Sequence, residues 1–201
     1  MKTTNFYGKY RGVVTDISDP LCTARIKAKV PDIFGTDESG WALPCVPFAG
    51  EGFGMCALPA VGSWVWIEFE QGDPDYPIWS GCFWGTPKEP PAGTLLPPYK
   101  KLLLKTSGGN KLTLDDTPGV GGITLETQSG EKLVLSANSV ALSTKAGHKL
   151  ELAPAGIALE TPAGQKLQLG PAGITISSGG LGVIKVTQAK VDVNSGALEV
   201  T

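Results

Sequence analysis

The sequence predicts an all-β protein that joins two different β architectures in series. Glycine and proline together make up about a fifth of the 201 residues, so turns are frequent and long helices are not expected. All five Trp, four Tyr and six Phe precede residue 100, and beyond it short aliphatic motifs recur every 17 residues. We therefore expect a first domain over 1–87, a Pro-rich connector over 88–101 and a repeat domain over 102–201.

Five short β-prone segments, separated by turn signals, fill the first domain. They are expected at 9–19, 22–30, 41–48, 64–70 and 78–84. In the second segment, apolar residues alternate strictly with Arg25, Lys27 and Lys29, which is typical of a half-buried strand. Five short strands in about 80 residues are typical of a small Greek-key barrel of the OB type, and closure removes the exposed sheet edges.

The tryptophans of this barrel have two possible roles. Trp64, Trp66 and Trp79 are suited to stacking bases, as in OB domains that bind nucleic acid, or to filling a core and a protein interface. Residues 1–99 contain 7 basic and 11 acidic residues, a net charge of −4. Because a negative domain repels phosphates, we favour the core or protein-interface role and expect no nucleic-acid partner.

The repeat domain consists of apolar-x-apolar pairs that alternate with glycine turns. One set recurs at 132–135, 149–152 and 166–169, and a second at 140–142, 157–159, 174–176 and 191–193. An earlier copy at 111–114 and 123–125 fits after a four-residue insertion. Twelve such pairs between residues 102 and 200 predict twelve short strands, which stack to a length on the order of 60 Å.

A single chain of this kind buries little surface, whereas three chains around one axis bury their aliphatic residues together. We therefore predict a trimeric, interdigitated triple-stranded β-helix, or β-prism; a single-chain β-solenoid that binds a ligand or ion is the alternative. A narrow threefold interior also explains the missing aromatic residues. The expected trimer core consists of Leu112, Leu114, Ile123, Leu125, Leu133, Leu135, Leu150, Leu152, Ile157, Leu159, Leu167, Leu169, Ile174, Ile176, Val191 and Val193.

No motif for catalysis, for a metal or for a cofactor is found in the sequence, so none of these is predicted. Cys22, Cys45, Cys56 and Cys82 form no C-x-x-C pair, and we expect buried free thiols in a protein made in a reducing cytoplasm. The single histidine, His148, lies in a predicted turn, where it is expected to be exposed. The N-terminus shows no secretory signal, and no segment has the length of a membrane helix.

The segment 59–81 resembles the OB domain of phage baseplate spike proteins, that is, the baseplate assembly protein V and VgrG-like families. The resemblance rests on a P-x-x-G, F-x-x-G-D-P-x-x-P and G pattern, formed here by Pro59, Gly62, Phe69, Gly72, Asp73, Pro74, Pro77 and Gly81. Shorter matches at 12–14, 19–20, 24–27 and 41–44 occur in the same order. The succession of OB domain and repeat extends the resemblance to the whole chain.

This resemblance implies a homotrimeric central spike of a contractile tail or injection machine, without the lysozyme domain that some members carry. It implies a baseplate hub protein bound at the OB end, a separate PAAR-like tip protein at the C-terminal end, and transient contact with the target cell membrane. The spike is then located in the tail baseplate of a virion or in an extracellular contractile particle, after assembly in the bacterial cytoplasm.

Two other functions remain as alternatives. One is a tail-associated depolymerase on a β-helical scaffold, which needs paired carboxylates and aromatic platforms for sugars. In the repeat domain, Asp115 and Asp116 are the only adjacent acids, and a solvated loop is the more ordinary role for them. The other is an OB module that binds nucleic acid, which the net charge disfavours. We therefore predict a protein that is not an enzyme.

Overall fold

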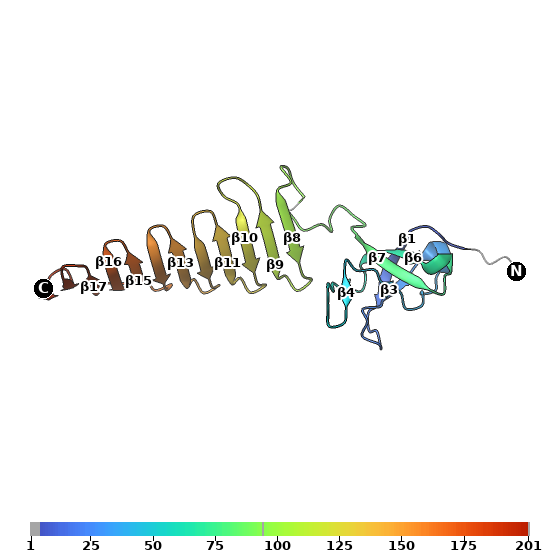
Figure 1. Ribbon diagram of the computed structural model, residues 1–201, viewed down its shortest axis with the longest axis horizontal. Helices are drawn as coiled ribbons and strands as arrows, with labels where there is room; N and C mark the ends of the chain where they lie inside the picture. Colours follow the sequence, from blue (N-terminus) through green and yellow to red (C-terminus); the bar gives the residue numbers. More distant parts are fainter. Residues whose placement is uncertain (1–4, 94, 201) are drawn as a thin grey trace. The chain divides into compact units, whose positions relative to one another are not determined.

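The computed structural model describes residues 5–93 and 95–200. Residues 1–4, Thr94 and Thr201, which fall within the expected domains, lie outside the described residues. The chain divides into two compact units, Met1–Pro90 and Pro91–Thr201, each of which is described separately (Figure 1). Apart from one short α-helix and one short 3₁₀ helix, the described elements are β-strands, so the all-β prediction is confirmed.

The first unit is a five-stranded sheet with the strand order β2-β1-β6-β7-β3. Its strands are β1 (Tyr10–Asp16), β2 (Lys27–Lys29), β3 (Leu43–Pro44), β6 (Trp64–Phe69) and β7 (Pro77–Phe83). All neighbours are antiparallel except β3 and β7, which are parallel. A bridge between Ile26 and Ala42 joins the β2 end of the sheet to the β3 end, which closes the barrel. The remaining elements are α1 (Pro31–Phe34), η1 (Glu70–Gly72) and a hairpin of β4 (Ala49–Gly50) and β5 (Phe53–Gly54).

Alternation along the strands builds the core of the barrel. In β6, Val65, Ile67 and Phe69 are buried while the residues between them are half-buried on the outer side. Trp79 is buried with them, and its indole Nε1 donates a hydrogen bond to the carbonyl oxygen of Ala24, at 3.0 Å. The hydrophobic cluster therefore fills the inner side of the barrel strands.

The expected strand over 22–30 is shorter than the alternation predicts. Asp19 accepts hydrogen bonds from the backbone N–H groups of Leu21, Thr23 and Arg25, and its carboxylate pairs with the Arg25 guanidinium at 2.5 Å. These bonds hold the chain in a loop with positive φ at Cys22 and Ala24. Regular strand structure therefore begins only at Lys27.

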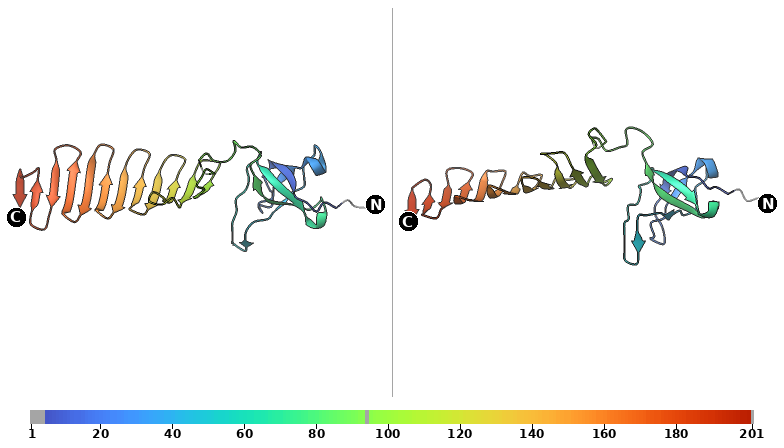
Figure 2. Two further views of the ribbon diagram at one scale, coloured as in Figure 1. Left: turned by 90° about the horizontal axis from the view of Figure 1, so that it is seen from above. Right: turned by 45° about the horizontal axis from the view of Figure 1, so that its top comes forward.

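The second unit is a twelve-stranded antiparallel sheet in which each strand pairs with the next along the chain (Figure 2). Its strands are β8 (Lys101–Lys105), β9 (Lys111–Asp115), β10 (Gly122–Glu126), β11 (Lys132–Ser136), β12 (Val140–Ser143), β13 (Lys149–Ala153), β14 (Gly156–Glu160), β15 (Gln165–Gly170), β16 (Gly173–Ser178), β17 (Val183–Val186), β18 (Val191–Val193) and β19 (Leu198–Val200). The twelve strands expected from the repeat are present.

The four cysteines are free but exposed, so the expectation that they are buried was wrong. Cys45 and Cys56 flank the β4–β5 hairpin, and Cys22 lies in the loop that Asp19 organises. Cys82 faces outward from β7, where partial burial raises the pKa of its thiol. The apolar neighbours of Cys82 in the sequence did not indicate a buried position, because successive strand residues point to opposite faces. The other three cysteines lie outside the strands, where apolar neighbours do not indicate burial either.

Candidate trimer interface

The two faces of the twelve-stranded sheet differ in chemistry. The register pairs Leu150 with Leu142 and Leu159, and it pairs Leu152 with Val140 and Ile157. The same pattern continues through neighbouring strands, so aliphatic side chains form two parallel columns on one face, called here the inner face. The sheet is therefore strongly amphipathic along its length.

All sixteen residues that the sequence assigns to a trimer core lie in these two columns. One column contains Leu112, Leu125, Leu133, Leu150, Leu159, Leu167, Ile176 and Val193, and the other contains Leu114, Ile123, Leu135, Leu152, Ile157, Leu169, Ile174 and Val191. The columns also include residues that the sequence analysis did not select, namely Leu102, Leu104, Val140, Leu142, Ile184, Val186 and Leu198. The same apolar-x-apolar pattern marks them in the sequence.

Within the second unit, no described segment covers the inner face. The side chains of Leu125, Leu142 and Leu159 are 45%, 48% and 45% exposed. The two columns of exposed aliphatic side chains form a contiguous apolar surface along the sheet, and such a surface marks an interaction site. The inner face is thus the candidate functional site of the second unit.

The outer face carries polar and charged side chains. Glu126 lies between two lysines, with its Oε1 at 3.3 Å from Lys111 Nζ and 3.7 Å from Lys132 Nζ. Lys101 Nζ lies 3.2 Å from Asp115 Oδ2. These pairs are partly exposed, so they contribute modestly to stability and mainly keep this face hydrated.

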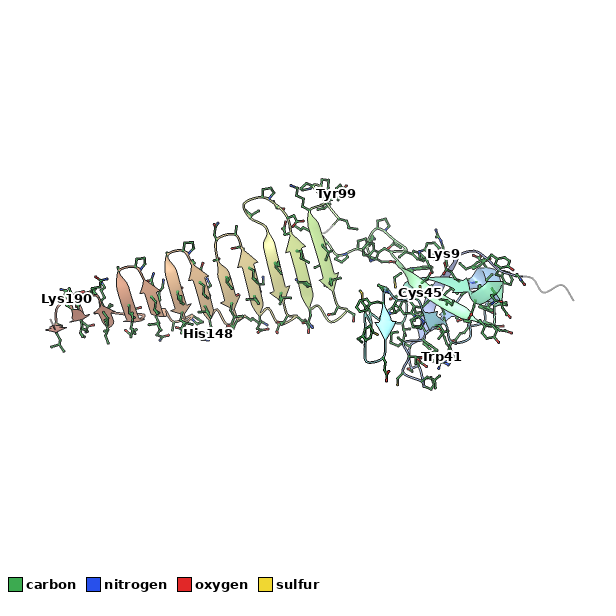
Figure 3. All side chains as sticks on the ribbon, viewed as in Figure 1. Lys9, Trp41, Cys45, Tyr99, His148 and Lys190 are labelled. Atoms are coloured by element: carbon green, nitrogen blue, oxygen red, sulfur yellow. The ribbon has the colours of Figure 1, made fainter. Side chains whose placement is uncertain are left out.

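Five-residue turns at 106–110, 127–131, 144–148 and 161–165 form one long edge of the sheet, called here the threonine edge. Each begins with a threonine whose Oγ1 accepts a hydrogen bond from the backbone N–H four residues later, as between Thr144 and His148. In the turn 127–131, hydrogen bonds from the hydroxyls of Ser129 and Thr127 lower the pKa of Glu131 to about 2. His148 is exposed on this edge, and Tyr99 lies at the opposite one (Figure 3).

Turns at 115–122, 136–139, 153–156 and 170–173 form the opposite edge, called here the glycine edge. Gly122, Gly156 and Gly173 begin strands with positive φ values of 158°, 130° and 121°. A β-carbon on these residues would lie 2.1, 1.9 and 2.0 Å from the carbonyl oxygens of Leu135, Leu169 and Val186. Only glycine allows the chain to turn this tightly against the next strand.

The inner face is hollowed along the threonine edge. A groove of about 580 Å³ lies between the turns 144–148 and 161–165, and Leu142, Leu150, Leu159, Leu167 and Ile176 line it. A second groove of about 320 Å³ lies between Asn110 and the turn 127–131, and its apolar lining is Leu125, Leu133 and Leu142. Both grooves are therefore apolar and open.

In the barrel, the residues of the predicted family motif shape the turn around β6 and β7. Gly62 and Gly72 have φ values of 88° and 80°, and a β-carbon on Gly72 would come within 3.0 Å of the Phe6 nitrogen. Asp73 Oδ1 accepts the Asp75 N–H at 3.0 Å. Phe69, Pro59 and Pro77 are buried, Pro74 is half-buried, and Gly81 has a φ value of 137° in β7.

Outward-facing aromatic residues form a second apolar feature on the barrel. The Trp66 and Phe83 rings lie 4.5 Å apart, and the Arg11 guanidinium carbon lies 5.9 and 5.6 Å from their centroids. Trp64 contacts Phe83 at 5.7 Å. Of the three tryptophans considered from the sequence, only Trp79 therefore belongs to the core.

Over residues 5–93 and 95–200, no cluster of three or more metal-ligating side chains is found. Among the same residues, no helix is long and apolar enough to cross a membrane.

The fold defines a class of protein, namely a small β-barrel followed by a long, amphipathic antiparallel sheet built from repeats. Residues 10–84 match the type VI secretion system/phage-baseplate injector OB domain. Residues 101–155 and 139–199 match the phage baseplate V C-terminal trimerisation domain. The chain belongs to the phage baseplate V and VgrG-like spike family, and the predicted resemblance is confirmed.

Curated relatives include two spike proteins of type VI secretion systems. VgrG4b of Pseudomonas aeruginosa is 34% identical over 100 residues, which cover 47% of this chain and 12% of the relative. VgrG3 of Vibrio cholerae is 34% identical over 96 residues, or 45% of this chain and 9% of the relative. The actin cross-linking toxin VgrG1 of Vibrio cholerae is 35% identical over 101 residues, which cover 47% of this chain and 9% of the relative. The matched region is therefore a small part of each relative, and the comparisons support a structural role in the spike of a tail-like injection machine.

Proposed function

We propose that this chain forms the homotrimeric central spike of a contractile injection machine, and that it transmits the force of contraction to a target cell envelope. The observation that carries the proposal is the uncovered inner face of a sheet that belongs to a trimerisation domain. Three such faces around one axis bury the sixteen predicted core residues against each other and leave the charged outer faces in water. A dry core of branched aliphatic side chains makes a stiff shaft.

The two ends of such a spike have different partners. The barrel is the end that binds the baseplate hub, and the C-terminal strands are the end that binds a separate tip protein. During contraction the shaft contacts the target membrane transiently. The outward aromatic cluster around Trp66, together with Arg11, is suited to a protein contact, because aromatic residues and arginine are enriched in interfaces.

In this proposal, the hub-binding barrel domain covers 1–87, the connector covers 88–101 and the shaft covers 102–201. In the proposed spike, the chain supplies shape and stiffness and contributes no catalysis. The location that follows is the baseplate of a tail-like particle, with assembly in the bacterial cytoplasm.

Light scattering coupled to size exclusion tests the proposal directly. A mass of three chains at micromolar concentration is expected, and a monomer at that concentration overturns the proposal. Incubation of the purified trimer with cell envelope tests the absence of catalysis. Released sugars or peptides would favour the depolymerase alternative instead.

A further inference from the structure

We propose that neighbouring chains in the trimer meet edge to groove. The glycine-edge turn 153–156 of one copy occupies the 580 Å³ groove beside the threonine edge of the next copy. The longer glycine-edge turn 115–122 occupies the 320 Å³ groove in the same way. This inference rests on the trimeric assembly proposed above and adds which surfaces of the copies touch.

The two edges of the sheet differ, and this difference determines the kind of contact. In a closed trimer, each copy uses one surface toward the copy on one side and another surface toward the copy on the other side. The threonine edge carries both grooves, whereas the glycine edge presents tight turns. If the glycine edge of each copy contacts the threonine edge of the next, all three copies therefore make the same contacts.

Each groove lies at the same level along the stack of strands as one glycine-edge turn. A threefold rotation moves a chain around the axis without translation along it, so parts at the same level of the sheet meet. The larger groove lies between the turns that join β12 to β13 and β14 to β15. The glycine-edge turn between those two levels joins β13 to β14, and this is the turn 153–156.

The smaller groove obeys the same relation. It lies between the turns that join β8 to β9 and β10 to β11. The glycine-edge turn between these levels joins β9 to β10 and contains the inserted residues 117–120. Each of the two grooves thus lies at the same level of the sheet as one glycine-edge turn.

The chemistry of the turns agrees with that of the grooves. The turn 153–156 reads Ala-Pro-Ala-Gly, and both Pro154 and Ala155 are exposed. The longer turn presents Val120, whose side chain is 80% exposed in the single chain. Burial of Val120 against Leu125 and Leu133 of the neighbouring copy removes this exposed apolar side chain from water.

Disulfide trapping in the full-length protein tests the arrangement. The repeat domain contains no cysteine, because all four native cysteines precede residue 83. Two double variants are made, Ala155→Cys with His148→Cys and Ala155→Cys with Gln165→Cys. All three positions are exposed, so these substitutions disturb no core. Light scattering first confirms that each variant is trimeric, and mild oxidation follows.

We expect a covalently closed trimer on a non-reducing denaturing gel in at least one double variant. Mass spectrometry then identifies the peptide pair that is joined. Each single variant and the parent protein serve as controls and are expected to show no link within the repeat domain. Val120→Cys with Asn110→Cys repeats the test at the smaller groove.

A mismatched pair, Ala155→Cys with Ser129→Cys, tests the height. Their levels differ by three strands, or roughly 14 Å, which is beyond the reach of a disulfide. The inference is overturned by trimers without links in all matched variants, by links in a single variant, or by a link in the mismatched pair. A monomeric parent protein overturns the trimer itself, and this result is distinguishable because it appears before oxidation.

Discussion

Gly156 lies so close to Leu169 that a β-carbon at position 156 would be 1.9 Å from the Leu169 carbonyl oxygen. The backbone at Gly156 also has a φ value of 130°, which L side chains rarely adopt. The two adjacent strands can therefore approach this closely only because residue 156 has no side chain. The same relationship recurs 17 residues later between Gly173 and Val186.

We expect Gly156→Ala to destabilise the repeat domain strongly, because both the backbone conformation and the contact with Leu169 must change. Gly196→Ala is the matched control, since Gly196 also has positive φ but its β-carbon would meet no atom within 4 Å. The control is expected to cost about 1–2 kcal/mol per chain from the backbone conformation alone. Urea unfolding that gives equal losses for the two variants would contradict the role assigned to the close approach.

Leu150→Asp is expected to prevent trimer formation. In the proposed trimer, three carboxylates would be buried near one axis without partners. We expect the apparent affinity between chains to fall on the order of 100-fold or more, which corresponds to about 2.7 kcal/mol. Glu151→Gln, on the outer face of the same strand, is the control and is expected to leave the mass at three chains. A trimer of unchanged stability in Leu150→Asp would show that the inner face is not the interface.

Ile67→Ala is expected to destabilise the barrel by about 2–5 kcal/mol, because Ile67 is fully buried and the substitution leaves a cavity. Leu21→Ala, at a side chain that is 66% exposed, is expected to change stability by less than about 0.5 kcal/mol. Fluorescence reports the barrel alone, since all tryptophans lie in it. A similar loss in both variants would show that the barrel core is not where the contacts place it.

Asp19 makes the stability of the barrel depend on pH. The Arg25 side chain, together with backbone N–H groups, holds the pKa of the Asp19 carboxyl well below its ordinary value of 3.8. A lowered folded pKa gives stability that is present above the ordinary pKa. That stability is lost as the pH falls below the ordinary value toward the folded one.

We therefore expect Asp19→Asn to lower the urea midpoint of the barrel at pH 7 and to have less effect near pH 2. Asp37→Asn, at an exposed aspartate, serves as the control. A difference in urea midpoint between Asp19→Asn and the unmodified protein that stays the same from pH 7 to pH 2 would refute the dependence of stability on the Asp19 carboxylate.

The repeat domain was more predictable from the sequence than the barrel. Its strands obey one period, so Leu159 occupies the position that Leu142 occupies one repeat earlier, and both lie in the same column of the inner face. The short turns between the segments bring each strand beside the next, so the pairing of consecutive strands follows from the sequence as well.

In the barrel, the limits of the strands depend on contacts between residues that the sequence does not relate. The Asp19–Arg25 pair replaces the start of an expected strand by a loop. The hydrogen bond from Trp79 to Ala24 joins residues that are 55 positions apart. Neither contact follows from alternation or from turn signals, so neither could be predicted.

For the candidate interface, the alternation predicted which residues share a face but not what surrounds them. The grooves arise where the turns of the threonine edge border the inner column, and this depends on three-dimensional turn geometry. The exposed Val120 lies in the four-residue insertion that the repeat analysis detected only as an interruption. Its exposure became evident from the structure alone.

The pairing of each strand with the next along the chain makes the 17-residue repeat a unit of length. Removing or adding one repeat changes the sheet by two strands, or roughly 10 Å, and leaves the inner and outer faces where they were. The length of such a shaft can therefore change by whole repeats while the two aliphatic columns of its inner face are kept. Evolution can lengthen or shorten it by duplicating or deleting the segment between two glycine-edge turns.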